Sequence, residues 1–147
     1  MQNNYDKIED TVRYMYGSVV WSHKIQEKQA DIYSRRFKCM ETLTIIVGAI
    51  TTTGMLSLLF IDEFWIKILS ALLSFITVLT GSFSKSFDLR SMANNHKASA
   101  NKFLSKRNEL NIFLMKIKLH QNDPQDLTEQ CEKLVHDINL ICQEAPI

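Results

Sequence analysis

The chain has 147 residues, of which 46% are hydrophobic and 22% are charged, and its formal net charge is +1. This length supports a single domain, and a net charge so close to zero gives no overall electrostatic reason to expect a nucleic-acid partner. The three cysteines form no CxxC pair, which favours reduced thiols in a cytosolic compartment over a disulfide framework.

Residues 1–41 are mostly polar and predict a helical arm. From Ile8 to Val19, apolar side chains recur at spacings of four, three and four, which predicts a short amphipathic helix over residues 5–17. A second, polar helix is expected over residues 19–39, and such a helix needs a packing partner. The aromatic residues of this region are expected to pack as core, with the ring of Trp21 resting on a partner helix as the alternative.

Residues 40–83 contain two apolar stretches, 42–61 and 64–83, separated by the acidic pair Asp62-Glu63. Each stretch has the length of about 20 residues that a helix needs to cross a bilayer. One helix over both would be about twice too long and would place the acids at mid-membrane, so a two-helix transmembrane hairpin is predicted. The alternative is a buried hairpin in a soluble helical protein. Because the first apolar run follows a long polar stretch, we expect a retained anchor and no signal peptide.

Small and polar residues form a stripe along each expected span. The stripe comprises Thr44, Gly48, Thr51 and Thr52 in the first span, and Lys67, Ser70, Ser74, Thr77 and Gly81 in the second. Small residues let membrane helices approach closely, and threonine hydroxyls can bond across such a contact. The same stripes could instead line a water-filled pore in an oligomer, and both interpretations stay open. Lys67 is near the outer end, where it is expected to snorkel to the interface or to ring a pore mouth.

A second cytoplasmic helix is predicted over residues 84–121, because no glycine or proline interrupts this region. Its heptad-like apolar seam includes His96, Ala100, Phe103, Leu110, Leu114 and Ile117. The seam predicts packing along the N-terminal arm or between subunits. Asp123 as N-cap and Pro124 at the first helical position then begin an amphipathic helix over residues 124–143.

Basic residues are concentrated beside both spans, with five between residues 23 and 41 and six between residues 84 and 108, whereas the turn is acidic. The positive-inside rule therefore predicts an inner-membrane protein with both termini in the cytoplasm and basic residues near anionic headgroups. The sequence has no phosphate-binding loop, no nucleophile elbow and no metal-ligand cluster, and two spans are too few for a transporter. We therefore expect no enzyme activity, no cofactor, and no direct nucleic-acid or small-molecule site.

Three segments of this layout are the polar helix WSHKIQEKQADIYSRRFK, the turn IDEFW and the basic helix SFDLRSMANNHKASANKFLSKRNEL. With them, over about residues 10–120, the chain resembles the SLATT family of two-transmembrane effector domains from bacterial nucleotide-signalling and anti-phage defence systems. The resemblance implies one all-α domain over residues 1–147. It also implies an effector that oligomerises into a pore, or otherwise disrupts the membrane, when infection is sensed, and so causes growth arrest or death.

The resemblance further implies a sensor or enzyme partner encoded alongside, because the chain has no room for a nucleotide-binding fold. The alternative function is a non-conducting membrane anchor whose cytoplasmic helices recruit partners. A homo-oligomer in the lipid bilayer is expected because the long helical arms carry apolar seams.

Overall fold

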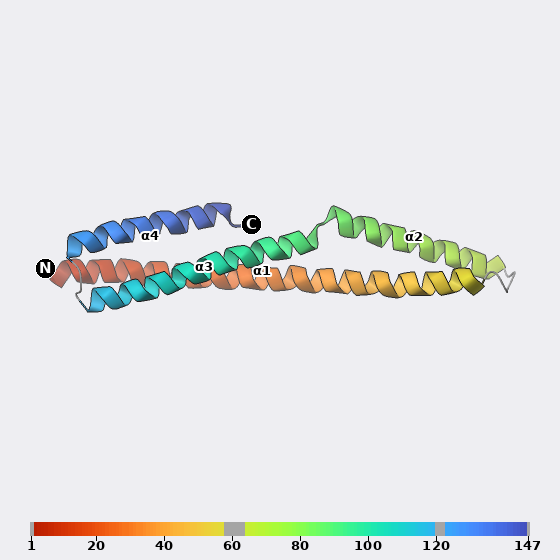
Figure 1. Cartoon of the computed structure of the whole chain (residues 1–147), viewed down its shortest axis with the longest axis horizontal. Coiled ribbons are helices and arrows are strands. Elements are labelled where there is room, and N and C mark those ends of the chain that lie inside the picture. Colours follow the sequence, from red (N-terminus) through yellow and green to blue (C-terminus); the bar gives the residue numbers. More distant parts are fainter. Residues whose placement is uncertain (1, 58–63, 120–122, 147) are drawn as a thin grey trace. The chain divides into compact units, whose positions relative to one another are not determined.

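The computed structural model describes residues 2–57, 64–119 and 123–146, and these residues form four helices without a strand. The helices are α1 (Gln2–Ser57), α2 (Phe64–Ser86), α3 (Leu89–Lys118) and α4 (Pro124–Glu144) (Figure 1). The prediction of an all-α chain is thereby confirmed. Two compact units divide the chain: a bundle unit of Met1–Ala30 with Asn94–Ile147, and a hairpin unit of Asp31–Ala93. Each unit is described by itself below.

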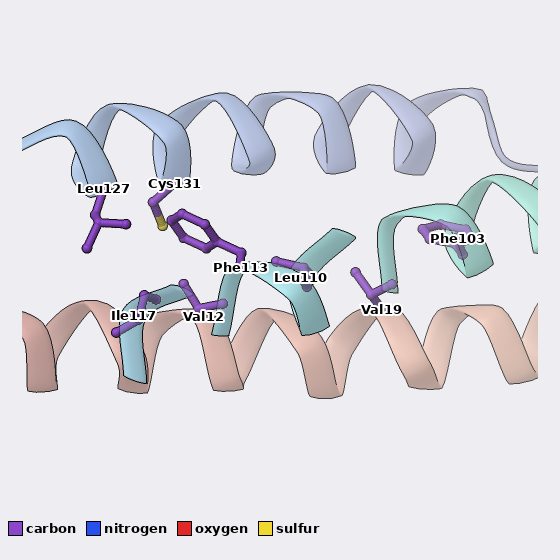
Figure 2. Packing of buried hydrophobic residues seen from close by; sticks show 8 residues of the cluster. All are labelled: Val12, Val19, Phe103, Leu110, Phe113, Ile117, Leu127 and Cys131. Atoms are coloured by element: carbon purple, nitrogen blue, oxygen red, sulfur yellow. The ribbon is translucent and has the colours of Figure 1, made fainter. Parts of the chain in front are cut away.

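The bundle unit packs three helical segments around one apolar cluster (Figure 2). The cluster consists of Val12 and Val19 from α1, Phe103, Leu110, Phe113 and Ile117 from α3, and Leu127 and Cys131 from α4. Segments with one apolar stripe each must bury it against a neighbour, and three such segments enclose a shared core. This cluster is therefore what holds the bundle together.

The seam that the sequence places on α3 lies inside this bundle. His96, Ala100, Phe103, Leu110 and Ile117 are buried and Leu114 is half-buried. Phe113 is also buried, although it lies off the heptad seam. It packs in the cluster that includes Leu127 and Cys131 of α4, so a second neighbouring helix widens the buried face of α3 beyond one seam.

The N-terminal arm differs from the prediction in two ways. First, α1 runs unbroken through Gly17 rather than as separate helices over 5–17 and 19–39. A single helical glycine costs only about 1 kcal/mol relative to alanine, whereas Val12 and Val19 on either side are fully buried. Second, the expected core packing is wrong for Tyr14 and Trp21, whose side chains are 81% and 71% exposed.

The expected helix over residues 84–121 instead begins at Leu89, because α2 continues to Ser86. Asp88 caps the start of α3: the backbone N–H of Ser91 donates to its Oδ1 at 3.0 Å, and the N–H of Met92 donates to its carbonyl at 2.9 Å. An aspartate side chain at this position satisfies a donor that the helix start would leave unpaired. No glycine or proline lies at this boundary, so the absence of helix-breaking residues wrongly predicted a continuous helix here.

The start of α4 agrees with the expected one. Asp123 is the N-cap in extended conformation, Pro124 is the first helical residue, and the N–H of Leu127 donates to the Asp123 carbonyl at 3.1 Å. The Asp123 side chain forms no cap hydrogen bond. The acidic turn Asp62-Glu63, the end of the first expected span at 58–61, and the end of the expected second cytoplasmic helix at 120–121 lie outside the described residues.

Candidate functional site

The hairpin unit contains the expected membrane segments. Within the described residues, one stretch is long and apolar enough to cross a membrane, Phe64–Phe83, which coincides with the predicted second span. Only 6% of the residues in its most apolar window are buried by the rest of the chain, so this segment needs lipid or another protein around it. The predicted first span reaches beyond Ser57 into residues that are not described, and the two-helix transmembrane hairpin is therefore not confirmed.

The polar stripes lie partly inside the hairpin unit. Thr51 and Ser70 are buried, Thr44, Gly48, Ser74 and Thr77 are half-buried, and Thr52, Lys67 and Gly81 are exposed. The centre of each stripe is thus covered within a single chain, whereas Gly81 and Lys67 at the ends of the second stripe are open. This is the arrangement that the packing interpretation of the stripes requires.

The two helices approach closely at Gly54, a residue that the sequence analysis did not single out. A Cβ atom placed on Gly54 would lie 3.2 Å from Ser70 Oγ of α2, which is tighter than ordinary van der Waals contact. Gly48 and Gly81, both members of the predicted stripes, have no such neighbour within 4 Å. The contact is therefore made by small residues as expected, but one turn or more away from Gly48. The signal in the sequence was the spacing of Gly54 three residues after Thr51.

Gly54 gives a direct test of this contact. We expect Gly54→Leu to destabilise the hairpin by at least about 1 kcal/mol, because the new side chain must displace Ser70 in a tightly packed contact. The matched control is Gly81→Leu, which gains the same helix propensity but meets open space. The measurement is thermal unfolding of the detergent-solubilised chain. Equal melting temperatures for the two variants would contradict the contact.

The stripe hydroxyls are mostly satisfied within their own helices. Thr51 Oγ1 donates to the Val47 carbonyl at 2.8 Å, and Thr77 Oγ1 donates to the Leu73 carbonyl at 2.9 Å. Thr44 and Thr52 donate in the same way to the carbonyls four residues before them. A carbonyl one turn back is always available to a helical threonine, so the expected bond across the contact is not needed. Among the described residues, the buried Oγ of Ser74 has no hydrogen-bond partner.

Aromatic side chains mark both ends of the α2 span. Phe64 and Trp65 at its start are exposed and pack edge to face, with ring centroids 6.3 Å apart. Phe83 at its end stacks on Phe87 with centroids 5.5 Å apart, and both rings are exposed. Aromatic rings favour the membrane–water interface. Their positions therefore delimit a span of about 30 Å at 1.5 Å per residue.

In the bundle unit, a buried polar contact joins three elements through Gln26. Its Nε2 donates to the carbonyl of Pro146 at 3.2 Å, so its Oε1 faces His96 Nδ1 at 2.6 Å. This fixes the tautomer, because His96 must donate from Nδ1 to an amide oxygen. Burial lowers the pKa of His96, so the neutral imidazole is the favoured form. Gln26 was not predicted, since one glutamine in a polar helix gives no periodic signal.

Ion pairs also connect α3 to α4. From α3, Lys106 Nζ lies 2.8 Å from Asp137 Oδ2 of α4, and Lys102 Nζ lies 2.6 Å from Glu144 Oε2 of α4. Lys106 Nζ also lies 2.8 Å from Glu109 Oε2, one turn along α3 itself. Burial opposes the charge of Lys106, but its hydrogen bonds to the two carboxylates outweigh this and raise its pKa. The same hydrogen bond from Lys106 lowers the pKa of Asp137. These pairs orient α4 on α3, with the larger share of stability left to the apolar cluster.

Nothing in the described part of the chain has the form of a metal or cofactor site. None of its His, Cys, Asp and Glu residues gather in a group suited to a metal ion. A shallow groove of about 280 Å³ lies between α3 and α4, with Ile112, Phe113 and Leu134 on its walls. Burial raises the pKa of the Cys131 thiol, which suits a small apolar core residue.

The sequence of the chain matches one known protein family over almost its whole length. Residues 8–147 match the family described as "SMODS and SLOG-associating 2TM effector domain family 4". The chain belongs to the SLATT family. No curated protein and no solved structure shows a significant match to it. The match extends over both the bundle unit and the hairpin unit, so the SLATT domain is essentially the whole chain.

The family description fits a membrane location. SLATT domains are two-transmembrane effector domains, and the segment Phe64–Phe83 is long and apolar enough to be one of the two spans. The description also associates these domains with SMODS and SLOG systems, which is consistent with partners encoded alongside. The resemblance stated from the sequence is thereby confirmed, and membership in the family implies a membrane effector of the kind found in defence systems.

Proposed function

We propose that this SLATT domain oligomerises in the inner membrane and opens a water-filled pore on activation, which arrests growth or kills the cell. The observation that carries the proposal is the buried Ser74 hydroxyl, which lacks a partner within the described residues. A hydroxyl without a partner in an apolar surrounding carries a desolvation cost, and contact with water in a lumen would remove it. In this proposal the hairpin seen here is the closed arrangement.

In this proposal, assembly of several chains drives the change from the closed hairpin to the open pore. Most large apolar side chains of Phe64–Phe83 are exposed, so neighbouring hairpins can pack against them without first displacing part of the chain. Separation of the two helices at Gly54 and Ser70 would then turn Ser70, Ser74 and Thr77 toward a shared lumen. Hydroxyl groups without rings of charge pass small ions with little selectivity. Both termini and the bundle unit would lie in the cytoplasm, where a partner encoded alongside can reach them.

The double variant Ser74→Leu/Thr77→Leu tests the lumen. We expect it to insert normally but to abolish depolarisation of cells that express the protein, because leucine at both positions makes the lumen apolar and closes it to water. The matched control is Ala71→Leu/Val78→Leu, which adds apolar volume on the exposed side of α2. Membrane potential is read with a voltage-sensitive dye, with insertion checked by carbonate extraction. Depolarisation by the Ser74/Thr77 variant equal to the unaltered chain would exclude these residues from the lumen.

A non-conducting anchor is the second candidate, and one observation favours it. Thr51 and Ser70 are buried inside the hairpin unit of a single chain, as expected if the stripes serve packing alone. The anchor then acts through the bundle unit, and Phe103→Glu or Leu114→Glu should abolish toxicity while Ser74→Leu/Thr77→Leu leaves it intact. The pore proposal expects the reverse for the stripe variant, so the two variants separate the candidates.

A further inference from the structure

Four basic side chains lie where α1 enters the hairpin unit and where α3 begins. Arg35, Arg36 and Lys38 lie on α1 and Arg90 lies at the start of α3, and all four are exposed. We refer to these four residues as the basic collar. Arg36 and Lys38 flank Phe37 in the sequence, and the guanidinium of Arg90 makes a cation–π contact with the Phe37 ring, with 6.0 Å from Cζ to the ring centroid. The contact brings the two helices of the collar together around one aromatic ring.

The basic collar is not neutralised by the described part of the chain. Basic residues of the bundle unit form ion pairs, such as Arg13 with Glu9 at 2.6 Å and Lys106 with Asp137 at 2.8 Å. Within residues 2–57, 64–119 and 123–146, no carboxylate is paired with any of the four collar side chains. The nearby acid Asp88 already accepts the Ser91 N–H as the cap of α3. Asp31 and Glu41 lie one helical turn from Arg35 and Lys38 on α1 but form no ion pair with them, so the collar side chains remain open to an anion from outside these residues.

The neighbouring aromatic pair, Phe83 and Phe87, indicates the depth of the collar relative to the membrane. The exposed rings of Phe83 and Phe87 mark the end of the apolar span, and Arg90 lies three residues after Phe87, just beyond the break between α2 and α3. Side chains at this depth meet the phosphate layer of the inner leaflet. The Arg90 side chain is exposed, so its N–H donors are open to a phosphate, which can accept two of them.

We infer that the basic collar binds the headgroups of anionic phospholipids and so fixes the depth of the hairpin. Charge complementarity and continuity with the span favour a lipid phosphate over a soluble anion. The inference goes beyond the proposed pore, since it rests on the membrane location alone. A chain that binds anionic lipid but never conducts ions would keep the collar and end the pore proposal.

Native mass spectrometry of the full-length, detergent-solubilised protein tests the collar. Because no bilayer is present, the loss of basic residues cannot act by changing the orientation of the chain in a membrane. Phosphatidylglycerol and phosphatidylcholine with identical acyl chains are added in turn, and retained lipid is counted. We expect preferential retention of phosphatidylglycerol. The variant Arg35→Gln/Arg36→Gln/Lys38→Gln/Arg90→Gln should lose more than about tenfold of that affinity, because each basic residue near an anionic surface contributes a factor of about five.

The matched control removes four charges from the bundle unit instead, through Lys7→Gln, Arg107→Gln, Lys116→Gln and Lys133→Gln. It should retain phosphatidylglycerol as the unaltered chain does. The single variants Arg36→Gln and Arg90→Gln should each give an intermediate loss, which keeps the test valid if the fourfold variant misfolds. Equal retention of both lipids by the unaltered chain, or equal losses in the collar and control variants, would overturn the inference. Displacement of the lipid by millimolar inorganic phosphate, or tighter binding of a single-stranded RNA, would overturn it as well.

Discussion

Leu110→Ala is expected to destabilise the bundle unit by about 3 kcal/mol, within the range of about 2–5 kcal/mol for a leucine-to-alanine change in a packed core. Leu110 is fully buried in the cluster that joins α1, α3 and α4. Its truncation removes apolar contacts and leaves a cavity that three helices cannot easily collapse. The measurement is chemical or thermal unfolding of the detergent-solubilised chain, followed by helical circular dichroism.

Ile112→Ala is the matched control on the same helix. Ile112 is 54% exposed, so the same type of truncation should cost less than about 1 kcal/mol. Hydrogen exchange localises the effect: amides of α4 should exchange faster in Leu110→Ala because α4 packs on the same cluster. Similar unfolding curves for the two variants would show that this cluster is not the main source of stability in the bundle unit.

Gln26→Leu is expected to cost about 1–3 kcal/mol, because it leaves His96 Nδ1 and the Pro146 carbonyl without their shared partner. Gln29→Leu is the control on the exposed side of α1 and should be close to neutral. The C-terminal residues should also exchange faster in Gln26→Leu. A stability unchanged from that of the Gln29→Leu variant would mean that the buried contact contributes nothing measurable.

The same contact predicts an acid-sensitive bundle. Burial lowers the pKa of His96 in the folded chain, so below about pH 6.5 the unfolded state binds more protons than the folded state. The free energy of unfolding should therefore fall as the pH drops below about 6.5, and should stay level above neutrality as far as His96 is concerned. His96→Leu should weaken this dependence. Denaturation curves recorded between pH 5 and pH 8 measure this pH dependence of the free energy of unfolding. If the His96→Leu variant showed the same dependence as the unaltered chain, groups other than His96 would be responsible for it.

The sequence predicts the helical class and the buried face of α3 because both depend on one repeated pattern. His96, Phe103, Leu110 and Ile117 recur at helical spacing, so any neighbour that covers one of them covers the others. The span over residues 64–83 is equally readable, because length and apolarity decide it without knowledge of a partner. Family membership was recognisable from layout, since the SLATT match extends over residues 8–147.

Features that depend on a single contact could not be predicted. The break at Asp88 depends on one cap hydrogen bond, and no glycine or proline marks it. Trp21 was expected in the core together with the other aromatic residues of the N-terminal arm, but its side chain is exposed on α1. Gly54 and Gln26 matter because of Ser70 and His96, which are distant in sequence. The spacing of residues along one helix gives no information on which residue of another helix contacts them.

Ion leakage from liposomes that contain the purified full-length chain, with the mass of the inserted oligomer determined in parallel, tests the proposed pore most directly. The account predicts leakage of small ions from an oligomer of several copies, and loss of that leakage in Ser74→Leu/Thr77→Leu. Liposomes that stay tight at every protein density, although the chain is inserted and oligomeric, would contradict the pore and leave the non-conducting anchor as the function of this SLATT domain.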